Sequence, residues 1–166
     1  MALVLRRLTK DDIAQRLAWP EYPCWARYSD FYCFGSEEDL WRWCNTSGTT
    51  CYAAVKTSQG ESYLVGFVAI LDKGDSARIS LMLHPDCLST SVGGRLILRA
   101  LVHCFVFLGA RSVEAVVAET NRRMLRIASA FRAKQVAQRE GARTFVLKRS
   151  DFMSSRWFSD RYLARL

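Results

Sequence analysis

The sequence of 166 residues is long enough for one domain with a substantial core. Half of its residues are hydrophobic and 12% are aromatic, which excludes a disordered chain. The formal net charge is +8, and residues 121–166 alone hold 12 basic and 3 acidic side chains. Such a basic end suits a nucleotide cofactor, a nucleic acid or an acidic protein, and charge does not choose among them.

Hydropathy and cysteine spacing bear on location and metal binding. The longest apolar run, residues 96–108, is too short to span a bilayer and is interrupted by Arg99 and His103. Arg6 and Arg7 follow a short apolar stretch, the reverse of a secretory signal, so we expect a cytoplasmic protein. The six cysteines form no CxxC pair, so we expect reduced and mostly buried thiols, with disulfides or a metal site as the less favoured alternatives.

The N-terminal third predicts a strand, two short helices and an aromatic segment. Residues 3–8 are typical of a strand, and Thr9 is an N-cap candidate for a helix that runs to about Ala18. A second helix opens at Ser36 and ends near Cys44. Between the two helices, residues 19–34 hold too many aromatic side chains for an ordinary loop, which indicates core packing, a hydrophobic acceptor pocket or a partner-binding surface.

Strand and helix patterns then alternate to the end of the chain. The predicted ranges are strands at 50–56, 62–72, 77–83 and 113–118, helices at 94–108 and 121–133, hairpin strands at 136–138 and 144–148, and an amphipathic helix at 151–166. No repeat or linker interrupts this order. We therefore expect one mixed α/β domain over residues 1–150, with residues 151–166 packed on it as a helix or tail.

The segment from Ile79 to Arg95 carries the chemistry. A strand ends before Pro85, a loop of small residues follows, and a helix begins. The backbone N–H groups of such a loop can approach a phosphate, and a helix N-terminus adds partial positive charge. A tight strand-to-helix turn that binds nothing is the alternative, because short loops of glycine and serine are common.

The strand, the sequence LHPD, the loop, the helix, the strand VEAVVAETN and a second helix together resemble the GNAT acyltransferase superfamily. The resemblance runs from Leu3 to Lys148, and the branch that acetylates ribosomal-protein N-termini and related amines is the most similar in appearance. It implies a mixed, mostly antiparallel twisted sheet flanked by helices. It also implies acetyl-CoA as co-substrate and an amine of a protein or small molecule as acceptor.

In that family the strand before the loop splays from its neighbour to admit the pantetheine arm, and the loop amides hold the pyrophosphate. By position, the thioester would lie along residues 81–83, and an asparagine after the next strand would contact the cofactor arm. The cofactor-binding residues implied here are Leu81, Met82, Leu83, Leu88, Ser89, Thr90, Ser91, Val92, Gly93, Gly94, Arg95, Asn121, Arg122 and Met124. An N-cap is the alternative role for the asparagine, and a solvated basic face is the alternative for the arginines.

Several positions depart from the family pattern. Leu88 replaces a polar residue of the loop, and Ser91 stands where its first glycine is usual. The tyrosine that serves many relatives as acid toward the departing thiolate is replaced by Ala128, with Ser129 beside it. The usual Gly-Phe at the end of that helix is replaced around residues 132–133. Because of these departures, a catalytically inactive member of the family is an alternative to an active enzyme.

Direct transfer to an amine requires a group that removes its proton. Glu119 and His84 are the candidates, because both are predicted at strand ends that face the proposed cleft. Glu119 as an exposed carboxylate and His84 as a turn residue closed against Asp86 are the alternatives. A backbone N–H near Leu83 would polarise the thioester carbonyl.

Three functions therefore follow from the sequence. The first is an N-acyltransferase that uses acetyl-CoA on an amine. The second is a non-catalytic adaptor that binds a protein partner through residues 19–34 or through the basic C-terminus. The third, ranked last because no reader motif is present, is nucleic-acid binding through that basic end.

Overall fold

The computed structural model describes residues 2–23, 29–58, 60–88, 90–156 and 158. The strands are β1 Ala2–Arg7, β2 Thr49–Ser58, β3 Glu61–Asp72, β4 Ser76–Leu83, β5 Ser112–Ala118, β6 Lys134–Arg139 and β7 Ala142–Lys148. The helices are α1 Lys10–Leu17, α2 Glu37–Cys44, α3 Val92–Val102, α4 Arg122–Ala130 and α5 Arg149–Met153, with short turns η2 Asp30–Tyr32, η3 Pro85–Cys87 and η4 His103–Phe107. Within these described ranges, no helix has the length and hydropathy needed to cross a membrane.

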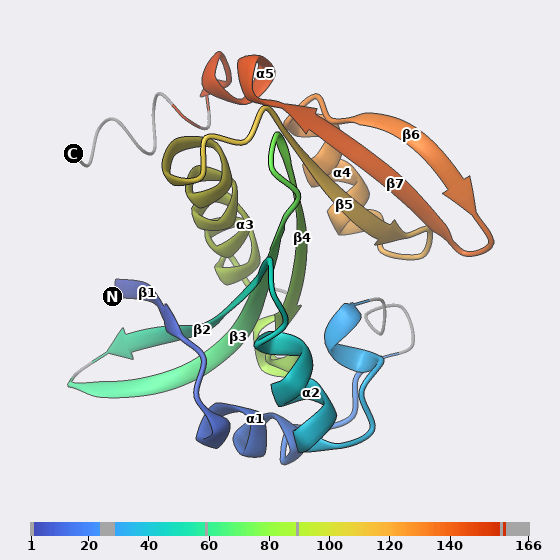
Figure 1. Ribbon diagram of the computed structural model, residues 1–166. Coiled ribbons are helices and arrows are strands. Elements are labelled where there is room, and N and C mark those ends of the chain that lie inside the picture. Colours follow the sequence, from blue (N-terminus) through green and yellow to red (C-terminus); the bar gives the residue numbers. More distant parts are fainter. Residues whose placement is uncertain (1, 24–28, 59, 89, 157, 159–166) are drawn as a thin grey trace.

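The strands form one seven-stranded sheet in the order β1-β2-β3-β4-β5-β7-β6. Every neighbouring pair is antiparallel except β4 and β5, which run parallel. Their pairing joins residues 76–78 to residues 112–114, and beyond it the two strands diverge (Figure 1). The predicted α/β domain with a mixed, mostly antiparallel sheet is confirmed, and we call the opening between β4 and β5 the split.

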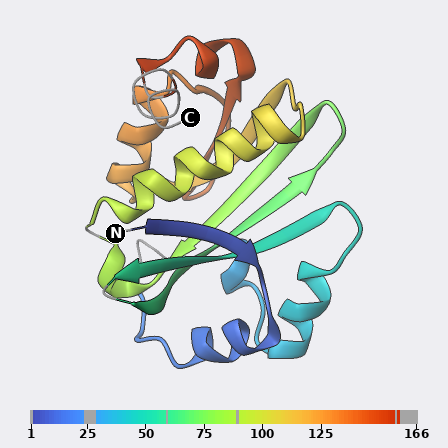
Figure 2. The ribbon, with the colours of Figure 1, turned by 90° about the vertical axis from the view of Figure 1, so that its left-hand side faces the viewer.

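Alternation along β3 divides the core between the two faces of the sheet. Val68 and Ile70 pack in one cluster with Leu96 of α3, whereas Phe67 and Ala69 pack in another with residues of α1 and α2. Figure 2 shows α3 on one side of these strands and α1 and α2 on the other. The β4 wall of the split therefore belongs to a part of the sheet that is covered on both faces.

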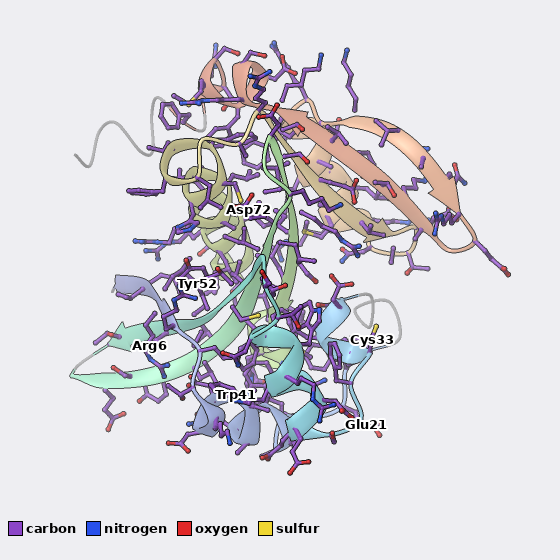
Figure 3. The ribbon with its side chains drawn as sticks, viewed as in Figure 1. Arg6, Glu21, Cys33, Trp41, Tyr52 and Asp72 are labelled. Atoms are coloured by element: carbon purple, nitrogen blue, oxygen red, sulfur yellow. The ribbon has the colours of Figure 1, made fainter. Side chains whose placement is uncertain are left out.

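A buried ion pair anchors α1 to β1. Thr9 is the predicted N-cap, and its N–H donates to Asp12 Oδ2 at 2.8 Å. Arg6 donates to both carboxylate oxygens of Asp12 at 2.7 Å, although Asp12 is only 1% exposed. Burial alone would raise the pKa of Asp12, but the hydrogen bonds from Arg6 and Thr9 outweigh it and lower that pKa. Figure 3 shows where Arg6 lies on β1.

The aromatic segment is mostly core on the face of the sheet opposite α3. Phe31 is completely buried, Tyr22 is nearly so, and Trp19 packs against Phe67 with ring centroids 5.1 Å apart. The core interpretation thus holds for these side chains. Residues 24–28, which include two more of the aromatic residues, lie outside the described part of the chain.

The end of the chain differs from the prediction. Instead of one helix over residues 151–166, α5 begins at Arg149 and ends at Met153, where a turn at residues 154–155 interrupts it. Phe152 is completely buried and stacks on Phe105, and Phe158 packs on Phe152. Phe152 and Phe158 fill the core from a short segment, so burying them does not require a long amphipathic helix. Residues 157 and 159–166 lie outside the described residues.

The described cysteines carry free thiols. Cys44, Cys51 and Cys104 are buried, as predicted, whereas Cys87 is half-buried and Cys33 is exposed. A hydrogen bond that the Cys51 thiol donates to the Cys44 side chain and burial both raise the pKa of Cys51, so this thiol stays protonated.

Candidate functional site

The backbone of β4 is free to bind along the split. His84 N donates to Val65 O at 2.9 Å, at the end of the ladder that pairs β4 with β3. Ladder bonds in an antiparallel pair come from alternate residues, so Leu81 and Leu83 turn their N–H and C=O groups away from β3, toward β5. Unpaired strand edges of this kind accept an extended polar chain by backbone hydrogen bonding.

A cavity of about 120 Å³, which we call the split cavity, fills the opening between β4 and β5. Residues 79–83 of β4 form one wall and residues 115–118 of β5 form the other. Gly93, Gly94 and Leu96 of α3 and Met124 and Ile127 of α4 close it from one face of the sheet. Its walls are mainly apolar, with polar backbone groups along β4, which suits an amide-containing alkyl chain.

The loop after β4 leads into α3 without needing a glycine at its first position. Ser91 has φ −72° and ψ −7°, an ordinary right-handed conformation, so the usual glycine is not required there. The N-cap residue Ser91 makes no side-chain cap on α3, but Val92 N donates to Thr90 Oγ1 at 3.3 Å. The amides of Gly93 and Gly94 are therefore the candidates for an anion contact at this helix start. A Cβ on Gly93 would lie 2.9 Å from Leu83 Cδ1, so the missing side chain keeps the loop close to β4.

Arg123 of α4 holds this loop from across the cavity. Its Nη1 donates to the Leu88 carbonyl at 3.0 Å, and its Nη2 donates to the Thr90 carbonyl at 2.6 Å. Arg123 also lines the split cavity. A guanidinium at this position has further N–H donors beyond those two bonds, and they can bind an anion.

Asn121 has the N-cap role that the sequence left open. Its Oδ1 accepts a hydrogen bond from Met124 N at 3.1 Å, at the start of α4. Asn121 and Met124 also line the split cavity. The cap accounts for the oxygen of the side chain, and its amide NH₂ is left for a cofactor contact.

The structure brings together eight of the predicted cofactor-binding residues. Those that line the split cavity are Leu81, Met82, Leu83, Leu88, Gly93, Gly94, Asn121 and Met124. Thr90, Ser91, Val92, Arg95 and Arg122 are described but do not line it. Ser89 lies outside the described residues.

The proposed catalytic side chains lie elsewhere than expected. The carboxylate of Glu119 accepts from Gln138 at 2.6 Å and from Arg143 at 3.4 Å, so it faces the β6–β7 hairpin. His84 Nδ1 accepts from Asp86 N at 3.2 Å, and its ring packs edge-on against Trp19. The expectation that Glu119 and His84 face the cavity is therefore wrong, because strand-end position fixes a backbone location and not a side-chain direction. Ser129 of α4 does not line the cavity either.

Tyr22 is a cavity residue that sequence reasoning did not select. Its hydroxyl donates to the Leu83 carbonyl, and its ring lines the split cavity. Burial strongly raises the pKa of Tyr22, so the hydroxyl keeps its proton. The loop position of Tyr22 has no periodicity that would distinguish it from its aromatic neighbours, and only the tertiary contact with β4 identifies it.

A second opening, the Arg78 pocket, lies on the opposite face of the sheet. It is formed by η2 with the flanking residues Ser29 and Cys33, by residues 78–80 of β4 and by Val116 of β5. Figure 3 shows Cys33 across the strands from α3. Ile79, Ser80 and Val116 line both openings, so the two meet where β4 and β5 part.

Residues 2–134 match the family described as the acetyltransferase (GNAT) domain. The chain belongs to the GNAT acetyltransferase family. No curated protein matches its sequence.

Solved structures match the GNAT domain over nearly its whole length. Spermidine/spermine N-acetyltransferase SpeG from Vibrio cholerae, in complex with manganese ions, is 16% identical with a TM-score of 0.68, covering 91% of this chain and 95% of that one. A chimera of SpeG and hSSAT is 16% identical with a TM-score of 0.74, covering 93% and 99%. A domain from Methanocaldococcus jannaschii DSM 2661 is 17% identical with a TM-score of 0.70, covering 89% and 98%. At these identities the likeness shows the fold.

The GNAT domain ends α4 with an arginine in a glycine conformation. Arg132 has φ +60°, and the N–H groups of Arg132 and Ala133 donate to the carbonyls of Ser129 and Ala128 at 2.9 Å each. These bonds are typical of a helix end that favours glycine. The predicted loss of the family glycine near residues 132–133 thus falls on a position where the backbone still needs positive φ.

Proposed function

We propose that this protein transfers the acetyl group of acetyl-CoA to an amine. The observation that carries the proposal is the split cavity, an apolar opening between parallel strands. On one side it has the backbone of Leu81 and the N–H of Leu83, which face away from β3, while the Leu83 carbonyl accepts from Tyr22. Leu88 of the loop and Gly93 and Gly94 of the first turn of α3 line the cavity, and phosphates would bind at this helix start. Family membership and the eight predicted residues that line the cavity support the same conclusion.

The residues of this chain divide the work of such a transfer. Acetyl-CoA supplies a thioester whose carbonyl carbon passes to the amine, so that a C–N bond forms and the C–S bond breaks. The N–H groups of Leu81 and Leu83 donate to polar groups of the pantetheine arm and to the thioester carbonyl. The amides of Gly93 and Gly94 and the guanidinium of Arg123 would bind the pyrophosphate.

Proton transfer requires a donor for the departing sulfur and an acceptor for the amine proton. Tyr22 is the donor that the cavity offers, because its protonated hydroxyl lies beside β4. To protonate the departing sulfur, this hydroxyl would exchange its hydrogen bond to the Leu83 carbonyl for one to the sulfur. It takes over the role of the tyrosine that Ala128 replaces on α4. His84 and Glu119 remain the candidate bases, and since neither lines the cavity, either would act through an ordered water.

Calorimetry with acetyl-CoA tests the proposal. We expect saturable binding in the micromolar range that Gly93→Glu removes, because a glutamate there fills the space beside Leu83 and repels phosphate. Gly94→Ala is the matched control, since a Cβ at Gly94 meets nothing within 4 Å. No heat at millimolar acetyl-CoA, with the protein folded, would refute the enzymatic function.

Tyr22→Phe separates the proton donor from the binding site. We expect kcat to fall about tenfold while the Kd for acetyl-CoA stays within a factor of about two, because the ring remains and only the hydroxyl is lost. Acetyl transfer is measured by release of the free thiol. An unchanged kcat would show that Tyr22 does not donate the proton.

An inactive adaptor is the second candidate, and the replacement of the family tyrosine by Ala128 favours it. Deletion of the whole segment 151–166 would remove the buried side chains of Phe152 and Phe158 and destabilise the fold. Deletion of residues 159–166 keeps both and is the better test of a basic partner-binding tail. Partner capture that depends on these residues, together with absent acetyl-CoA binding, would favour the adaptor.

A further inference from the structure

The Arg78 pocket and the split cavity adjoin each other from opposite faces of the sheet. Ile79, Ser80 and Val116 belong to both, directly after the last paired residues, Arg78 and Glu114. A thioester that enters along β4 from the α3 side therefore ends beside the Arg78 pocket on the η2 side. This inference rests on the proposed function, in which the second substrate must reach the thioester from a side that the cofactor leaves open.

The pocket is built around an ion pair between η2 and β4. Arg78 Nη2 lies 3.0 Å from Asp30 Oδ1, and the Arg78 side chain is 30% exposed and the Asp30 side chain 28% exposed. Asp30 N donates to Ser80 Oγ at 3.1 Å, which is 3.2 Å from Ser29 Oγ. Three bonds thus fix η2 against β4, and the guanidinium is held in a defined orientation.

Arg78 keeps an unused donor inside this arrangement. In the part of the chain that the structure describes, Arg78 Nε is buried and has no hydrogen-bond partner. A buried charged donor without a partner is unfavourable, because water is no longer available to it. A ligand oxygen that displaces the atoms covering Nε would satisfy it, and a guanidinium edge binds a carboxylate with two parallel hydrogen bonds.

We propose that the Arg78 pocket binds the acceptor and that Arg78 selects acceptors carrying a carboxylate beside the reactive amine. The carboxylate pairs with the Nε edge of Arg78, and the amine then points toward Ile79 and Val116, where the split opens. Small amino acids with a free amine are the substrate class that fits. Arg78 acts as a specificity-determining residue that contacts the substrate away from the reacting atoms.

Charge distinguishes this acceptor from a polyamine. The described lining of the pocket holds one acid and one base, Asp30 and Arg78, already paired with each other. No excess acidic side chain of that lining is left to neutralise a second ammonium group. The formal net charge of +8 further disfavours polycations and attracts anionic acceptors. The pocket therefore differs in expected substrate from the spermidine N-acetyltransferases of similar fold.

Kinetics with matched amines tests the assignment. Linear amino acids from glycine to 6-aminohexanoate are each compared with the alkylamine and the diamine of the same length. For the best length we expect kcat/KM of the amino acid to exceed that of the alkylamine by about 10- to 100-fold, the effect of one charged hydrogen-bonded pair. Arg78→Met should abolish this preference, and Asp30→Asn should preserve it because Arg78 keeps its charge. Arg111→Met, whose side chain is 81% exposed and pairs with Asp75 at 3.7 Å, is the matched control and should change nothing.

A direct measurement of amino-acid binding tests the role of Arg78 independently of acetyl transfer. In a ¹⁵N spectrum of the full chain, the Arg78 Nε–H signal should shift when the preferred amino acid is added, and the alkylamine should leave it unchanged. If acetyl-CoA fails to bind but this signal shifts, the proposed function fails and the pocket assignment stands. If acetyl-CoA binds and an alkylamine or diamine is acetylated as fast as the amino acid, the assignment is overturned. A preference that survives Arg78→Met, or an Nε–H signal that no amino acid shifts, overturns it as well.

Discussion

The split cavity and the Arg78 pocket meet at the same three residues but differ in what forms them. The split cavity is built mainly from two stretches of chain, residues 79–97 and 115–127, with Tyr22 added from the N-terminal third, and its walls are mainly apolar. The Arg78 pocket joins η2 to β4 and β5, and its character comes from one ion pair over a sequence separation of 48 residues. A binding site made of local segments leaves a pattern in the sequence, whereas a site made by tertiary contacts leaves none.

The largest expected effect concerns the β4 wall that both openings share. A Cβ at Gly66 would lie 2.5 Å from the Met82 carbonyl oxygen, so Gly66→Ala must displace β3 from β4. We expect a loss of about 3 kcal/mol in the free energy of unfolding, measured with urea. Gly35→Ala is the control, since a Cβ at Gly35 meets nothing within 4 Å, and it should change stability by less than about 0.5 kcal/mol.

The next effect concerns the lobe of α1, η2 and α2 that carries the Arg78 pocket. Asp12→Asn leaves the half-exposed Arg6 without its partner, and we expect a loss of about 2 kcal/mol near pH 7. Because the folded-state pKa of Asp12 lies below its unfolded value, its contribution is present above pH ~4 and is lost as pH falls through the folded pKa.

Urea unfolding between acidic and neutral pH checks whether the contribution of Asp12 to stability falls as the pH falls. The wild type and Asp12→Asn should converge in stability at acidic pH and differ most at neutral pH. Asp39→Asn is the control, because its side chain is 55% exposed and its pair with Arg42 lies at the surface. A constant difference between wild type and Asp12→Asn at every pH would contradict the proposed electrostatic cause.

The split cavity alone should respond to Gly93→Ala. The new Cβ would lie 2.9 Å from Leu83 Cδ1, so the Leu83 side chain, which lines the cavity, must shift. We expect calorimetry to show that acetyl-CoA binds about tenfold more weakly. Helix propensity favours alanine, so the fold should remain stable. Gly94→Ala should keep the wild-type affinity. Equal losses in both variants would show that Leu83 does not set the width of the cavity.

The smallest effect tests the end of α4. Arg132→Gly removes an unfavourable positive φ, and we expect a gain of about 1 kcal/mol in the free energy of unfolding, read from urea denaturation. Arg126→Gly, inside the same helix, should instead lower stability by about 1 kcal/mol. A loss at Arg132 would mean that its side chain makes a contact worth more than the relief of strain. Neither change should alter the amine preference set by the Arg78 pocket.

Much of the fold could be predicted because its signals are local. The apolar alternation of β2 to β5, the N-caps at Thr9, Ser36 and Asn121, and the small-residue loop before α3 each lie within a few consecutive residues. Such patterns depend on backbone geometry and periodicity, which a short stretch of sequence determines. The eight cavity residues were implied by the resemblance to the GNAT family, whose motif lies on these short segments. The closer likeness to the ribosomal-protein branch of the family remains a prediction.

Side-chain direction and long-range partnership needed the tertiary structure. The sequence placed His84 and Glu119 at strand ends, but packing against Trp19 and bonding to the β6–β7 hairpin turned them from the cavity. It gave no sign that Tyr22 meets Leu83 or that Arg78 meets Asp30. By itself the sequence determined a GNAT-like chain and most of the segments that line the split cavity. Only the folded sheet decided which side chains face the two openings, because those contacts join residues that no local pattern connects.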